Sequence, residues 1–165
     1  MPRFKITSTS LAPMDQDWEE IALTDATEAA LCAITGRHAL VLTNDMDVGD
    51  LPAAYLTAGA IVLSFPKFGD GRAYSQAQLL RQRRGYTGVL IARGDVLADQ
   101  VLFMRRCGFD AIDLSTMASG DTATTPDALT PFDHALTAFS HFYQPAADGS
   151  APVWASRHRV NHKAA

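Results

Sequence analysis

Four short apolar runs recur along the middle of the chain, and each is followed by a polar turn. The runs occupy residues 38–43, 60–65, 88–92 and 109–114. Because apolar residues follow one another directly, the runs are typical of strands that are covered on both faces of a parallel sheet. Segments with helical periodicity lie between them, so the pattern predicts βα units joined by right-handed crossovers. The repeat therefore predicts an α/β fold.

The predicted helices are defined by apolar residues at spacings of three and four. Ser75 is the expected N-cap of one helix and Asp95 that of the next, because both are polar residues directly before a periodic segment. Residues 115–131 are rich in Ser, Thr, Ala, Asp and Gly, which predicts a long loop. The helical segments are 15–36, 48–55 (weak), 75–84, 95–107 and 132–143.

The chain has 165 residues, enough for one ordinary hydrophobic core. We expect a single α/β domain over residues 15–143, with a mainly parallel sheet of four or five strands and flanking helices. A partial (β/α) barrel is the alternative, and its open edges would favour a homodimer. Residues 1–14 are expected to form an N-terminal arm or an edge strand, and residues 144–165 a disordered basic tail.

Composition restricts the classes of partner. Charged residues make up 19% of the chain and the net charge is −4, which argues against a general nucleic-acid binder. No apolar run is long enough to span a bilayer, and no apolar segment follows the short basic start, so we expect neither a membrane partner nor a signal peptide. The two cysteines, Cys32 and Cys107, are far apart and are expected to be buried thiols in the reducing cytoplasm.

Polar side chains gather where the predicted strands end, and residues 65–75 (FPKFGDGRAYS) contribute most of them. In parallel α/β sheets, ligands bind outside the carboxyl ends of the strands, so these side chains are expected to share one edge. The sequence predicts a cationic site for an oxyanion or carboxylate there. The expected anion-binding residues are Lys67, Arg72, Tyr74, Ser75 and Arg93, the acid/base candidates are Lys67, Asp70 and Asp113, and Asp45 and Asp95 complete the edge.

Each of these residues also has a simpler structural explanation. Arg72 is close enough in sequence to pair with Asp70, and Asp113 lies in an apolar strand where an unpaired carboxylate is costly, so Arg93 or Arg105 is its expected partner. Tyr74 is equally suited to pack its ring. If all the charges at this edge are paired with each other, the protein is a scaffold without pocket chemistry.

Motifs for specific cofactors are not found. The sequence contains no Walker loop, no GxGxxG and no HExxH, and its histidines have no metal-ligand spacing. Two isolated cysteines are too few to hold an iron–sulfur cluster. No cofactor and no metal are therefore predicted.

The segments FPKFGDGRAYSQAQLLRQRRGYTGVL and ARGDVLADQVLFMRRCGFDAIDL resemble a proteobacterial family of unknown function. Its members are often encoded beside assimilatory sulfite reductase and phosphoadenylylsulfate reductase, and carry the label of an oxidoreductase involved in sulfite reduction. The resemblance covers Trp18 and residues 40–143, whereas the tail after residue 144 and the loop before residue 51 depart from it.

The resemblance implies a role in sulfur assimilation in the cytoplasm, with sulfite reductase or phosphoadenylylsulfate reductase as partners. It supplies no mechanism. Two hypotheses follow: an accessory protein that binds an oxyanion or the reductase at the strand ends, or a small α/β enzyme, an oxidoreductase by its label, that acts on an anionic metabolite at the same edge.

Overall fold

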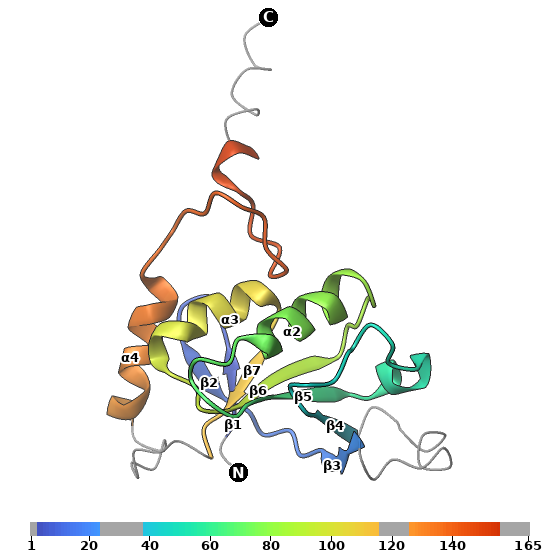
Figure 1. Cartoon of the computed structure of the whole chain (residues 1–165). Coiled ribbons are helices and arrows are strands. Elements are labelled where there is room, and N and C mark those ends of the chain that lie inside the picture. The colour runs from blue at the N-terminus through green and yellow to red at the C-terminus, as the bar shows by residue number, and fades with distance from the viewer. Residues whose placement is uncertain (1–2, 24–37, 116–125, 156–165) are drawn as a thin grey trace, which may run out of the picture.

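A mixed sheet organises the part of the chain that the computed structural model describes, which is residues 3–23, 38–115 and 126–155 (Figure 1). Within these residues the sheet has seven strands in the order β2-β1-β7-β6-β5-β4-β3. The strands are β1 (Arg3–Ile6), β2 (Leu11–Pro13), β3 (Glu19–Ala22), β4 (His38–Leu42), β5 (Ala60–Phe65), β6 (Val89–Gly94) and β7 (Ala111–Asp113), and the helices are η2 (Ala53–Thr57), α2 (Arg72–Gln82), η3 (Ala98–Gln100), α3 (Val101–Cys107) and α4 (Pro126–Thr137).

The five strands β3 to β7 are parallel and follow one another in sequence order, while β1 pairs antiparallel with both β7 and β2. Right-handed crossovers that always move in the same direction place their helices on the same face of a sheet. Figure 1 shows α2, α3 and α4 on one side of the strands. The predicted single α/β domain is confirmed, with more strands than the four or five expected.

The two faces of the sheet carry side chains of different size. Large apolar residues such as Leu40, Leu63 and Leu90 point toward the helices and form the main core. The opposite face carries small and β-branched residues, which pack with Met14 and Trp18 from the segment between β2 and β3. These are Ala39, Ala60, Val62, Ile91 and Ala111.

The sheet is strongly curved toward this second face. The chain passes from Pro13 at one edge to Glu19 at the other in six residues, which span at most about 22 Å. In a flat sheet, six steps of about 4.8 Å would separate these edge strands by about 29 Å. The edges must therefore approach each other, as they do in a sector of a (β/α) barrel.

Two predicted helices, 15–36 and 132–143, and the predicted loop 115–131 differ from the structure. The helix expected from residue 15 is replaced at Glu19–Ala22 by β3, because the open edge of β4 offers hydrogen bonds that three apolar residues at helical spacing cannot outweigh. Residues 24–36 of that helix lie outside the described residues, as does Cys32. The last helix occupies Pro126–Thr137, so part of the predicted loop is helical.

Residues 144–155, assigned from sequence to the tail, lie against the end of α3. The guanidinium of Arg106 donates to the carbonyl of Gln144 and stacks over the ring of Phe142, with its Cζ 3.7 Å from the ring centroid. Ala147 N donates to the carbonyl of Arg106 over 2.9 Å, and Arg105 pairs with Asp148. The first part of this segment therefore forms a wall beside α3.

Candidate functional site

The candidate residues at the carboxyl ends of the strands fall into two groups on different faces of the sheet. One group belongs to the loop between β5 and α2, on the helical face, and includes Lys67, Asp70 and Arg72. The other group lies at the ends of β6 and β7, on the face without helices, and includes Arg93 and Asp113. The sequence predicted one shared edge. Side chains alternate between the faces along a strand, so Arg93 and Asp113 lie on the same face as Ile91 and Ala111, away from the helices.

In the loop group, Asp70 accepts hydrogen bonds from two neighbours. Arg72 donates to both carboxylate oxygens, from Nε over 3.0 Å and from Nη2 over 2.7 Å. Asn44, which follows β4, donates from Nδ2 over 2.6 Å. The hydrogen bond from Arg72 is the largest influence that lowers the pKa of Asp70, to about 2. Asp70 is thus a permanent anion near neutral pH, and the predicted Asp70–Arg72 pair is present.

Asp45 and Lys67 lie at the outside of this loop group. Asp45 is exposed, and a hydrogen bond with Thr43 is the largest influence that lowers its pKa. Lys67 is exposed as well, and no ion pair joins it to any residue of the described chain. Lys67 is therefore the cation of this loop that stays available to a partner.

Asp95 and Ser75 do not cap helices, which corrects two predictions. The helical segment after β6 begins only at Ala98, and Asp95 Oδ2 instead accepts the backbone N–H of Phe68 over 2.9 Å. Ser75 lies inside α2, whose N-cap is Gly71. The helix begins directly after Gly71, so Ser75 does not present the helix N-terminus to an anion.

Tyr74 packs its ring rather than lining a polar site. Its ring centroid lies 5.0 Å from that of Phe65 and 4.9 Å from that of Phe103. Burial raises the pKa of the Tyr74 hydroxyl to about 12. Tyr74 therefore connects the loop between β5 and α2 to the outer surface of α3.

The second group forms an ion-pair cluster of Arg3, Glu20, Arg93 and Asp113. Arg93 donates to Asp113 Oδ2 from Nε over 3.0 Å and from Nη2 over 2.9 Å, and to Glu20 from Nη1 over 2.9 Å. Arg3 pairs with Glu20 and, over 3.5 Å, with Asp113. Asp113 is fully buried and Arg3 is 8% exposed. The cluster joins β1, β3, β6 and β7 across the curved face.

The charges of this cluster stabilise one another. Burial by itself raises the pKa of Asp113, but hydrogen bonds from Ser115 and Arg93 outweigh it and hold that pKa below its usual value. The hydrogen bond from Arg93 is the largest influence that lowers the pKa of Glu20. Both guanidiniums therefore face ionised carboxylates, and Arg93 is not a free anion clamp.

Sequence reasoning left Arg93 and Arg105 as alternative partners of Asp113, of which the structure shows Arg93, and it missed Arg3 and Glu20. Arg3 joins the cluster because β1 pairs antiparallel with β7 in a register that sets Arg3 opposite Asp113. Glu20 joins it because the sheet is curved. Neither the register of a short terminal strand nor the curvature leaves a signal in a local pattern of residues.

The described residues contain neither a cluster of metal-ligating side chains nor a membrane-spanning helix. No group of three or more His, Cys, Asp or Glu side chains among them is placed to hold a metal ion. None of the helices described is long and apolar enough to cross a membrane. The expectation that no cofactor binds stays a prediction.

Fold and site together define a small α/β protein with a curved, sequentially wound sheet and a carboxyl edge whose arginines are paired. A family model for bacterial proteins of unknown function, DUF934, matches residues 39–154. The chain belongs to this family. Comparisons with curated proteins and with solved structures found no match.

Proposed function

We propose that this protein is an accessory protein of assimilatory sulfate or sulfite reduction, which binds sulfite reductase or phosphoadenylylsulfate reductase through the carboxyl edge of its sheet. The pathway rests on the sequence resemblance. The binding mode rests on an exposed apolar patch at this edge, formed by Phe68, Leu97 and Phe103, which are 50%, 40% and 53% exposed.

The three side chains of the patch are held by neighbouring elements. The backbone of Phe68 is fixed to Asp95, two residues before Leu97, by the 2.9 Å hydrogen bond. The ring of Phe103 packs against that of Tyr74, which belongs to the first turn of α2. Exposed aromatic side chains on a rigid base are typical anchors of protein interfaces. Lys67 and Arg72 border the patch, so we expect an acidic surface on the partner.

Oxyanion capture at the same edge has less support. Arg72 is held by Asp70, and Arg93 by Glu20 and Asp113, so an incoming anion would have to replace ionised carboxylates. The alternative of an enzyme acting on an anionic metabolite meets the same obstacle. A carboxyl group with a pKa of about 2, such as Asp70, is also unsuited to general acid catalysis near neutral pH. Lys67 is the remaining candidate for contact with an anion.

The proposal is tested by measuring binding of the purified full chain to each purified reductase by biolayer interferometry. We expect Phe68→Ser and Phe103→Ser each to raise the dissociation constant about tenfold or more, as is typical of anchor residues of an interface. Tyr143→Ser is the matched control, because Tyr143 is 80% exposed and belongs to the segment after α4.

Two outcomes would refute this proposal. One is that neither reductase binds with a dissociation constant below about 100 µM. The other is that the patch variants bind as tightly as the wild type. A partner in this pathway also implies a cytoplasmic location, which cell fractionation checks.

A further inference from the structure

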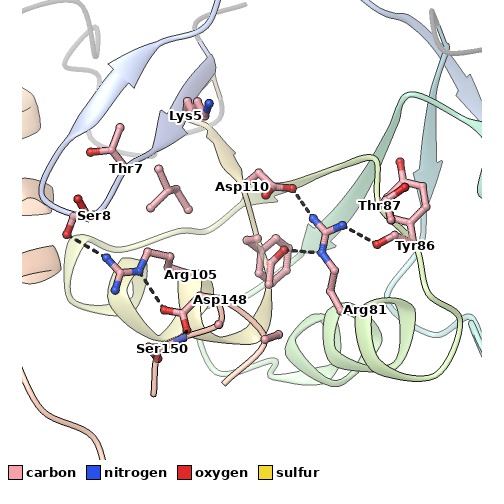
Figure 2. A pocket seen from close by; sticks show the side chains of 15 residues that line it. Lys5, Thr7, Ser8, Arg81, Tyr86, Thr87, Arg105, Asp110, Asp148 and Ser150 are labelled. Carbon is pink, nitrogen blue, oxygen red and sulfur yellow. Dashed lines mark hydrogen bonds and ion pairs between the residues drawn. The ribbon is translucent and has the colours of Figure 1, made fainter. Parts of the chain in front are cut away.

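A cavity of about 720 Å³ lies at the opposite edge of the sheet, where β6 and β7 begin (Figure 2). Its walls come from four parts of the chain: β1 with the turn after it, the end of α2 with the turn that follows, the end of α3, and residues 147–150. A second cavity of about 480 Å³ shares Lys5, Thr87 and Asp110 with it, so the two are adjoining parts of one groove.

Most charges in this groove are already paired. Arg81 binds Asp110 and the carbonyls of Tyr86, Gly88 and Gly108. These four bonds hold the end of α2 against the strand starts.

Arg105 pairs with Asp148 over 3.3 Å, and its Nη1 donates to the carbonyl of Ser8 over 2.9 Å (Figure 2). Each of these arginines has a carboxylate partner, so the paired charges in the groove cancel. Arg105 Nη2 makes no bond to the rest of the described chain, so this donor is left over.

Lys5 is the exception in the groove. It lies on β1 between Ala12 and Ala111, whose short side chains leave its flank open. Its side chain is exposed, lines both cavities and forms no ion pair with the described part of the chain. Lys5 therefore gives the larger cavity one cation more than it has carboxylates, while Asp15 lines only the second cavity.

The larger cavity combines donors that have no partner in the described chain with an apolar wall. The ammonium of Lys5, the second Nη of Arg105 and the hydroxyl of Thr87 have no hydrogen-bond partner in the described chain, and Ile6 and Phe109 line the same space. A cavity of this size is in the usual range for small-molecule sites. We propose that the larger cavity of this groove binds a small organic anion, with the phosphate or carboxylate on Lys5 and an apolar body against the wall that Ile6, Phe109 and Ala147 line.

This site is independent of the proposed function, because it lies at the amino edge of the parallel strands and shares no residue with the patch of Phe68, Leu97 and Phe103. The chain offers a matched pair of lysines. Lys5 and Lys67 are both exposed and lie at opposite edges, so Lys5→Met and Lys67→Met make the same change in charge and shape at the two sites.

The test is a titration of ¹⁵N-labelled full chain, followed by amide chemical shifts, with phenyl phosphate as the probe. Benzylamine carries the same ring with the opposite charge, and inorganic phosphate carries the charge without the ring. We expect phenyl phosphate to shift the amides of Thr7, Thr87 and Gly149, and to bind more tightly than either control.

Replacing the cation should remove most of this affinity. We expect Lys5→Met to weaken phenyl phosphate binding about tenfold, the scale of one charge-assisted hydrogen bond, whereas Lys5→Arg and Lys67→Met keep it. Circular dichroism and the melting temperature show whether each variant is folded, and Lys5→Arg separates loss of charge from a change in β1.

Four results would overturn the proposal: no shift with phenyl phosphate, equal binding of benzylamine, shifts confined to residues 66–72, or unchanged affinity in Lys5→Met. Equal affinity for inorganic phosphate would overturn the assignment of the apolar body. Failure of the reductase experiment leaves this test unaffected, because the two experiments use different residues and different ligands.

Discussion

Replacing Asp113 by Asn tests whether the ion-pair cluster stabilises the curved sheet. Asp113 Oδ2 accepts three N–H groups, two from Arg93 and a longer one from Arg3, and Oδ1 accepts the backbone N–H of Ser115 over 3.0 Å. Asn has nearly the same shape but no charge, so Arg3 and Arg93 would share Glu20 alone.

The magnitude follows from burial. Removing one partner of a buried ion pair typically costs about 3–5 kcal/mol, because the other charge stays buried without compensation. Arg93 is 18% exposed and Glu20 remains as a partner, so we expect a smaller loss, about 2–4 kcal/mol at pH 7. For a chain of this length, a loss of about 3 kcal/mol lowers the melting temperature by about 6–12 °C.

The loss should depend on pH with a definite sign. Hydrogen bonds hold the pKa of Asp113 below its usual value in the folded state. The stabilisation is therefore complete above the unfolded pKa of about 4, and it disappears as the pH falls through the folded pKa. The difference in stability between wild type and Asp113→Asn should be largest near pH 7 and should shrink below about pH 4.

Urea unfolding followed by tryptophan fluorescence measures this difference, and Trp18 is a suitable reporter because the Arg3 guanidinium lies 5.8 Å from its ring centroid. Arg72→Ala is the control, since its guanidinium is 58% exposed and its loss should leave the midpoint unchanged. A cost below about 0.5 kcal/mol for Asp113→Asn, or a cost that does not change with pH, would show that the cluster does not stabilise the sheet.

Two further predictions concern the backbone at Gly94 and the thiol of Cys107. Gly94→Ala should destabilise the fold by about 2–4 kcal/mol in the same urea assay, because φ is +118° and the new Cβ would lie 2.1 Å from the carbonyl oxygen of Phe65. Gly149→Ala is the control: φ is +76° and the space around it is open, so the substitution should cost only about 1 kcal/mol. In a Cys32→Ser background, Cys107 should react with a disulfide reagent at pH 8 only as fast as the chain unfolds. The reason is that the Cys107 thiol is fully buried and burial raises its pKa to about 11. Rapid reaction of the native chain would contradict this prediction.

The strands of the central sheet were predictable because their apolar runs carry the signal on every residue. Residues 60–65 coincide with β5, and the other three runs overlap β4, β6 and β7. The strands outside this repeat were harder. β3 has the sequence EEIA, in which Glu20 faces the cluster across the sheet, so its strand character comes from pairing with β4 and not from its own residues.

The contacts of the candidate site were predictable where they join neighbours in sequence or consecutive parallel strands. Arg72 finds Asp70 two residues away, and Arg93 finds Asp113 because consecutive parallel strands place them in register. The hydrogen bond of Asp95 was not predictable. An Asp before a helical pattern favours an N-cap, but here the loop after β5 lies close enough for the backbone N–H of Phe68 to donate to the Asp95 carboxylate. A contact between two loops is decided by the tertiary structure.

The curvature of the sheet gives the two edges different roles. Arg3 and Arg93 meet Asp113 through strand register, because β1 and β6 are the two neighbours of β7, but in a flat sheet Glu20 on the edge strand β3 would be too far away to reach them. Curvature brings Glu20 to both arginines, so all four charges of the cluster are paired on the second face. The exposed apolar side chains of the carboxyl edge, Phe68, Leu97 and Phe103, do not belong to this cluster. At the amino edge Arg81 pairs with Asp110 and Arg105 with Asp148, whereas Lys5 has no ion pair in the described chain. An uncompensated cation in a groove with an apolar wall is the arrangement that selects an organic anion, whereas exposed phenylalanines beside paired charges suit a protein surface.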